Sequence, residues 1–179
     1  MEELLDLKTR LEQERPADWN ALPDIALYMD QLVGYLPRQL IHFNDRDALT
    51  SAMVNNYIKD GLAPRADGKR YGPVHLGYLT AVSALKKVLT VRDIGVLLSA
   101  AQETGKDNEA LYAYFNRALD RALTDTANAI DPDTEPEHLA RLALDLALHS
   151  YASQLACTRI LDILQPAEDD HKGKKQKEK

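Results

Sequence analysis

The chain has 179 residues and a formal net charge of −6, with 45% apolar and 6% aromatic residues. This length suffices for one domain or two small ones with a buried core, and the many leucines and alanines of the second half favour helix over strand. A single cysteine, Cys157, excludes a disulfide framework, and the charged N-terminus lacks the pattern of a signal peptide, so we expect a cytoplasmic protein. No apolar run is long enough to span a bilayer, which predicts no membrane partner.

The first predicted elements are helices. Residues 1–15 predict a short surface helix that ends at Pro16, because the residue before proline disfavours the helical region. Residues 25–36 carry apolar side chains at helical spacing and predict a second helix. Thr50 is a good N-cap for a third helix, which runs to Asp60 and stops at the glycine that follows.

The next segment, residues 63–72, is punctuated by proline and glycine. Asp67-Gly68 is a hairpin-type turn signal and predicts a small two-stranded β-wing. Pro73 then begins a helix with a buried stripe of leucine and valine. Thr90 and Asp93 resemble a capping box that opens a helix over residues 91–101.

The last third of the chain predicts two long helices. The first covers residues 109–130, and a capping box at Thr134 and Glu137 opens the second, which runs to about Leu164. The second helix has alternating leucines and is apolar on most sides, which is typical of a helix that is buried or lies between subunits. It predicts either a dimerising helical hairpin or the helical core of a monomer, and residues 167–179 predict a disordered tail.

The charge is unevenly distributed along these elements. Between Arg46 and Leu98 there are eight basic and four acidic residues, a net charge of +4, so the rest of the chain carries −10. A basic module within an acidic protein is typical of nucleic-acid binding.

The helix after Thr50 has the polarity of a recognition helix. Val54, Tyr57 and Ile58 should face inward, which leaves an outer face that can bond bases or phosphates. That face consists of Ser51, Asn55, Asn56 and Lys59. The alternative interpretation is an ordinary solvated helix face.

The predicted wing carries a basic cluster of Arg65, Lys69 and Arg70, followed by Tyr71. On a wing these side chains would project towards phosphates, with Tyr57 and Tyr71 packing the helix against the wing and their hydroxyls free to reach phosphate. The alternative is a surface hairpin whose charges keep the protein soluble.

Residues 50–98 resemble the winged helix-turn-helix of the mercury-resistance-regulator (MerR) family. The resemblance rests on the order and spacing of Tyr57, Gly61-Leu62, Pro64, Lys69-Arg70-Tyr71, Leu76, Leu79, Val82, Leu85-Lys86, Thr90 and Asp93-Ile94. It implies a DNA-binding fold that acts as a dimer on paired half-sites. The chain differs from the family in having Asn55-Asn56 where the family has an Arg-Tyr pair, and in an insertion before Thr50.

Residues 20–165 also look like a small bacterial family of unknown function, which implies the same motif and no activity. Together these observations predict an all-α fold with a small two-stranded β-wing. The predicted divisions are an N-terminal helical extension (1–19), a MerR-like winged helix-turn-helix domain (20–103), a C-terminal helical hairpin (104–166) and the tail (167–179).

The predicted function is sequence-specific binding of double-stranded DNA in transcription regulation, as a homodimer, without a cofactor, metal or enzymatic activity. The predicted DNA-binding residues are Thr50, Ser51, Asn55, Asn56, Tyr57, Lys59, Arg65, Lys69, Arg70 and Tyr71. Two alternatives remain open. One is a protein–protein interaction module of winged-helix fold, and the other is a helical sensor whose small-molecule effector would bind near the polar stripe of Arg141, Asp145 and His149.

Overall fold

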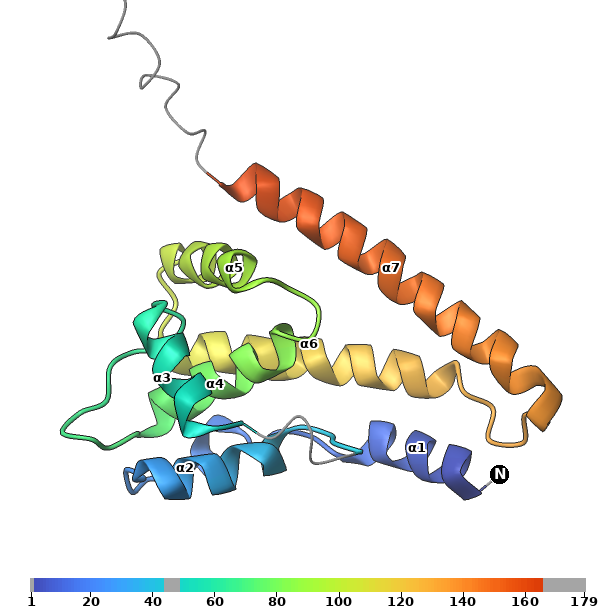
Figure 1. Cartoon of the computed structure of the whole chain (residues 1–179), viewed down its shortest axis with the longest axis horizontal. Coiled ribbons are helices and arrows are strands. Elements are labelled where there is room, and N and C mark those ends of the chain that lie inside the picture. The colour runs from blue at the N-terminus through green and yellow to red at the C-terminus, as the bar shows by residue number, and fades with distance from the viewer. Residues whose placement is uncertain (1, 44–48, 166–179) are drawn as a thin grey trace, which may run out of the picture.

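The computed structural model describes residues 2–43 and 49–165, and this part of the chain is mostly helical with almost no strand, which confirms the all-α class (Figure 1). The predicted tail, residues 167–179, lies outside the described residues. In chain order the elements are α1 (Glu2–Gln13), the 3₁₀ turn η1 (Trp19–Ala21), α2 (Met29–Tyr35), η2 (Leu36–Gln39), α3 (Ser51–Lys59), α4 (Pro73–Leu85), α5 (Val91–Glu103), α6 (Asn108–Asn128), η4 (Pro136–His138) and α7 (Leu139–Leu164).

Two helix starts were predicted correctly from their caps. The Thr50 hydroxyl accepts the Met53 amide at 3.3 Å at the start of α3. The Thr90 hydroxyl accepts the Asp93 amide at 3.2 Å and donates to the Asp93 carboxylate at 2.7 Å at the start of α5. Each cap satisfies an amide that the first helical turn leaves without a partner, so local sequence is enough to fix the boundary.

The second helix starts four residues later than its periodicity predicted. Its expected first residue, Ile25, is 74% exposed, and α2 begins only at Met29. The intervening Leu27 exchanges two backbone hydrogen bonds of 2.9 Å with Tyr71. Both backbone groups of Leu27 therefore bond a distant segment, which keeps residues 25–28 out of the helix.

The last helix also starts later than predicted. The Thr134 hydroxyl donates to the Asp131 carbonyl at 2.7 Å, and the Asp131 carboxylate accepts the Asp133 amide at 3.0 Å. These bonds close a turn, and α7 starts at Leu139 after η4. The predicted capping box of Thr134 and Glu137 was wrong, because the N-cap position before η4 is Glu135, which makes no side-chain cap bond, and Glu137 lies inside η4.

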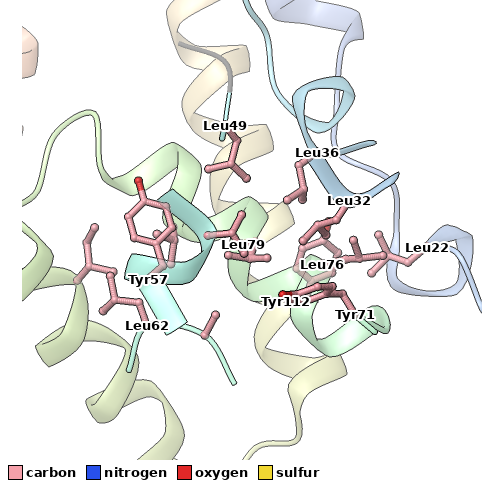
Figure 2. Close-up of a cluster of buried hydrophobic side chains, with 14 residues drawn as sticks. Leu22, Leu32, Leu36, Leu49, Tyr57, Leu62, Tyr71, Leu76, Leu79 and Tyr112 are labelled. Atoms are coloured by element: carbon pink, nitrogen blue, oxygen red, sulfur yellow. The ribbon is translucent and has the colours of Figure 1, made fainter. Parts of the chain in front are cut away.

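The core is built around α4. Leu76, Leu79 and Val82 of this helix are fully buried, and Figure 2 shows leucines from several other elements gathered around them. Val54 of α3 and Ile94 of α5 complete the cluster, also with no exposed surface. Burying each such side chain contributes about 1.5–3 kcal/mol, so this cluster fixes where α3 and its outer face lie.

Helix α6 belongs to the same core, although the sequence analysis placed it in a separate C-terminal unit. Its Tyr112 is 4% exposed within the cluster, and a Cβ added at Gly77 of α4 would meet the Tyr112 ring at 3.2 Å. Helix α1 lies along α6, where the Lys8 ammonium donates to the carbonyls of Ala127 and Ile130 at 3.1 and 2.8 Å. The N-terminal helix thus caps the far end of α6.

Helix α7 stands apart from this core. From the turn after α6 it runs diagonally across the molecule towards α5, which it contacts (Figure 1). Only Leu161 of α7 is buried, at 2% exposure, and the Cys157 thiol lies on a half-buried residue. The two long helices are consecutive, as predicted, but they diverge from their connection and leave much of α7 uncovered.

Candidate nucleic-acid interface

Helix α3 presents one buried and one exposed face. Val54 has no exposed surface and Tyr57 is 7% exposed, both in the core cluster. The residues predicted to face outward are all exposed, namely Ser51, Asn55, Asn56 and Lys59. Because α3 is anchored on one side only, its whole polar face is available to a partner.

The chain leaves α3 in a fixed direction. Asp60 ends the helix, and Gly61 has a φ of +76°, the left-handed conformation that glycine adopts without steric cost. The Leu62 amide then donates to the Tyr57 carbonyl at 2.8 Å, and Leu62 is 1% exposed. This anchoring sets the segment 63–72 beside α3 at one end of the molecule (Figure 1).

The tip of this segment is a tight turn, which we call the basic turn (Asp67–Arg70). The Asp67 amide donates to the Arg70 carbonyl at 3.0 Å, and the Arg70 amide donates to the Asp67 carbonyl at 2.8 Å. Gly68 and Lys69 occupy the two central positions, with φ of +51° and +72°. Positive φ at both positions defines a type I′ turn, centred one residue later than the Asp67-Gly68 signal suggested.

The base of the segment is held by two further contacts. Tyr71 pairs with Leu27 through the two backbone hydrogen bonds already described. The ring of His75 accepts the Gly72 amide at Nδ1 over 3.1 Å, and its Nε2 lies 2.9 Å from the Arg65 carbonyl. With Nδ1 accepting, Nε2 is the nitrogen that donates, so this ring ties the two ends of the segment together.

The predicted two-stranded wing is reduced to these contacts. The pairs Asp67–Arg70 and Leu27–Tyr71 are isolated β-bridges, and the described part of the chain forms no continuous ladder between residues 63 and 72. The segment is too short, and too interrupted by proline and glycine, to add further pairs.

The basic side chains predicted at this end of the molecule are exposed. Arg65, Lys69 and Arg70 lie on the segment, and residues 59–70 hold four basic and two acidic side chains, a net charge of +2. The Arg70 guanidinium donates to the Tyr28 hydroxyl at 3.2 Å and lies 5.3 Å from the centre of that ring. Tyr28 therefore orients Arg70 while its charge stays in solvent.

Three of the predicted contact residues have capping or packing roles within the fold. Thr50 is exposed, but its hydroxyl caps α3. Tyr57 and Tyr71 are 7% and 5% exposed, and burial raises the pKa of the Tyr57 phenol. The Tyr71 ring packs edge-on against His75, with 5.5 Å between ring centres. The packing role predicted for the two tyrosines agrees with this burial.

Sequence reasoning missed Tyr28, His75 and the pairing of Leu27. His75 is the third residue of a helix that begins with Pro73 after Gly72, a position from which a side chain can accept the N-cap amide, and this could have been recognised. The other two depend on contacts more than 40 residues apart in the sequence and have no local signal.

The polar stripe of α7 is exposed at Arg141, Asp145 and His149. An open groove beside Asp145 and His149 is otherwise lined by apolar and small side chains of α7 and by Ala129.

Among residues 2–43 and 49–165, no three histidine, cysteine or acidic side chains lie together as a metal site would require. No helix in the described part of the chain is long and apolar enough to cross a membrane.

These features define an all-α protein with an exposed polar helix beside a basic turn. A family model described as a domain of unknown function, DUF1836, matches residues 17–118, which is more than half of the chain. The chain belongs to this family, and the expectation of an uncharacterised family is confirmed. The matched region begins before η1 and ends within α6, so it includes α3, the basic turn and the core. Neither a curated protein nor a solved structure matches the chain.

Proposed function

We propose that this protein is a DNA-binding regulator of transcription with a MerR-like winged helix-turn-helix. In this proposal α2 and α3 are the helix pair, α3 enters the major groove, and the basic turn holds the neighbouring phosphates. The observation that carries the proposal is the exposed polar face of α3 beside a rigid, positively charged turn.

The proposed base contacts come from the outer face of α3. Asparagine side chains can bond an adenine edge through two hydrogen bonds, and a serine hydroxyl can bond either bases or phosphate. Asn55 and Asn56 occupy the middle of the exposed face, with Ser51 one turn before them and Lys59 one turn after. This arrangement supports readout by Asn55 and Asn56 in place of the Arg-Tyr pair of MerR proteins, with Lys59 on the backbone.

The proposed phosphate contacts come from Arg65, Lys69 and Arg70. The type I′ turn fixes the backbone at Lys69, and His75 fixes the backbone at Arg65. Tyr28 restricts the Arg70 side chain before any partner binds. Preorganised charges lose less conformational entropy on binding, which favours a site of this kind over a mobile basic loop.

We also propose that two copies pair through α7. Its outer side carries a continuous apolar row that we call the α7 seam, formed by Leu144, Leu148, Tyr151 and Leu155, each between 56% and 63% exposed. Their 4-3-4 spacing is that of the apolar positions of paired helices, and a row of this size is unusual on a monomer surface. The seam would join two DNA-binding units with twofold symmetry.

Dimerisation is tested by light scattering after gel filtration. A Leu148→Lys variant should be a monomer, while Ser150→Lys, a matched lysine on another side of α7, should remain a dimer. A monomeric parent protein, or equal behaviour of the two variants, would remove the seam from the proposal.

DNA binding is tested by fluorescence anisotropy with a pool of random duplexes at low and moderate salt. We expect binding that weakens steeply with salt and is lost in a Lys69→Glu/Arg70→Glu variant. The matched control is Arg117→Glu/Arg121→Glu, which makes the same charge change on the exposed surface of α6. Absence of binding at low salt, or equal loss in both variants, would refute a specific DNA face.

The other candidate function is a protein–protein interaction module. The net charge of −6 and the uncovered seam favour it. It predicts that the Lys69→Glu/Arg70→Glu variant keeps its partner, so the experiment above separates the two functions.

A further inference from the structure

A cavity of about 260 Å³ lies between α4, α5 and α6, away from the proposed DNA face. Its wall contains the rings of Trp19, Tyr78, Tyr112 and Phe115, with Leu98 and Ala101 on the α5 side. The cavity opens to solvent, because Tyr114 in its lining is 56% exposed. A dry apolar cavity of about 150 Å³ is already large enough to bind benzene, so this one has room for a larger ring system.

Hydrogen bonds join three polar side chains at the edge of the cavity. The Gln102 amide donates to the Tyr78 hydroxyl at 2.8 Å, and that hydroxyl donates to the Asn108 side-chain oxygen at 3.3 Å. Gln102 and Asn108 are both exposed, so this chain of bonds links α4, α5 and the start of α6 at the solvent edge. A bound molecule would meet a largely apolar wall beside this bonded edge.

The lining determines the class of ligand. None of its side chains carries a charge, and five of them are aromatic. A charged ligand would lose its hydration without gaining a partner, whereas a neutral ring would stack on the aromatic walls. We propose that this cavity is a binding site for a small, uncharged hydrophobic molecule with an aromatic or cyclic skeleton.

The site is placed to influence the reading helix through α5. Leu98 and Ala101 line the cavity, and on the same helix Ile94 is fully buried in the core. A Cβ added at Gly95 would lie 3.7 Å from Leu62, the third residue after the end of α3. An occupant that braces α5 against α6 therefore changes the support of α3. This regulatory consequence rests on the proposed DNA-binding function, but the existence of the site does not.

The site is tested on the full chain with the uncharged fluorescent probe N-phenyl-1-naphthylamine. We expect saturable binding that weakens about tenfold or more when the cavity is filled by Ala101→Phe or, on the opposite wall, by Ala118→Leu. Circular dichroism establishes that the variants fold, and two filling variants guard against the failure of one. The control is Ile25→Ser, which removes an apolar side chain that is 74% exposed and does not line the cavity, and which should bind the probe as the parent does.

Three outcomes would overturn the proposal. They are equal binding by the filled variants, loss of binding in Ile25→Ser, and probe affinity that falls as protein concentration rises, which would mean that a second copy fills the cavity. Repeating the DNA titration with saturating probe tests the regulatory consequence. If the protein binds no DNA at all, the probe titration still decides whether the site exists.

Discussion

Replacing Lys69 by glycine should stabilise the protein while weakening DNA binding. Lys69 has a φ of +72°, and an L-residue with a Cβ in this region costs about 1–2 kcal/mol. Glycine removes that strain, but it also gives the unfolded chain more conformational freedom, which destabilises the folded state by about 0.5–1 kcal/mol. Since the Lys69 side chain is exposed and adds little packing, we expect a net gain of about 0.5–1 kcal/mol.

The matched control is Arg65→Gly. It removes the same charge from the same segment, but Arg65 does not have a positive φ, so glycine relieves no strain there. We expect it to destabilise the protein by about 0.5–1 kcal/mol. Urea unfolding gives both free energies, and thermal unfolding should separate the two melting temperatures by about 2–8 °C.

Both variants should bind DNA more weakly, and each should lower the slope of log K against log salt by about 0.9, the value for one lost phosphate contact. A Lys69→Gly variant less stable than the parent would refute the strain argument. An unchanged salt slope would refute the phosphate contact, and the two results are independent.

Three further predictions concern the core and the support of the site. Leu79→Ala should lower the free energy of unfolding, measured with urea, by about 2–5 kcal/mol because Leu79 is fully buried. Leu144→Ala, at a position 57% exposed, should lower it by less than about 0.5 kcal/mol. Equal losses would contradict the core described here. His75→Ala should speed hydrogen exchange of the Gly72 amide about fivefold, because it removes a hydrogen bond worth about 1 kcal/mol. Unchanged protection of this amide would show that the His75 ring does not hold it. Burial raises the pKa of Tyr112 to about 12 from 10.0, so the neutral phenol favours the folded state; its contribution is complete below pH 10 and is lost as the pH rises to about 12. Circular dichroism across this range should show Tyr112→Phe keeping its helices to higher pH than the parent, and a coincident or earlier loss would contradict that linkage.

The parts of the fold that depend on neighbouring residues were predictable from the sequence. Thr50 and Thr90 cap their helices through amides three residues away, and Gly61 ends α3 because it can adopt a positive φ. The outer face of α3 was also predictable, because apolar spacing fixes which side of a helix is buried. The four exposed polar residues of this face and the basic residues that follow it are where the sequence placed them.

The rest depended on contacts between distant segments. Leu27 pairs with Tyr71, which holds residues 25–28 out of the helix that their spacing predicted. Tyr28 reaches Arg70 across 42 positions, and Tyr57 and Tyr71 are buried in the core.

The sequence by itself therefore determined the helical class, the main caps and the polar face of α3, because these follow from bonds and periodicity within a few residues. Only the tertiary structure decided which helices share the core, where the basic turn is anchored and that an apolar cavity lies behind α5. Trp19, Tyr78 and Phe115 line that cavity, yet they come from three elements of the chain. No local pattern brings them together, because their proximity depends on how the helices pack rather than on where each helix begins.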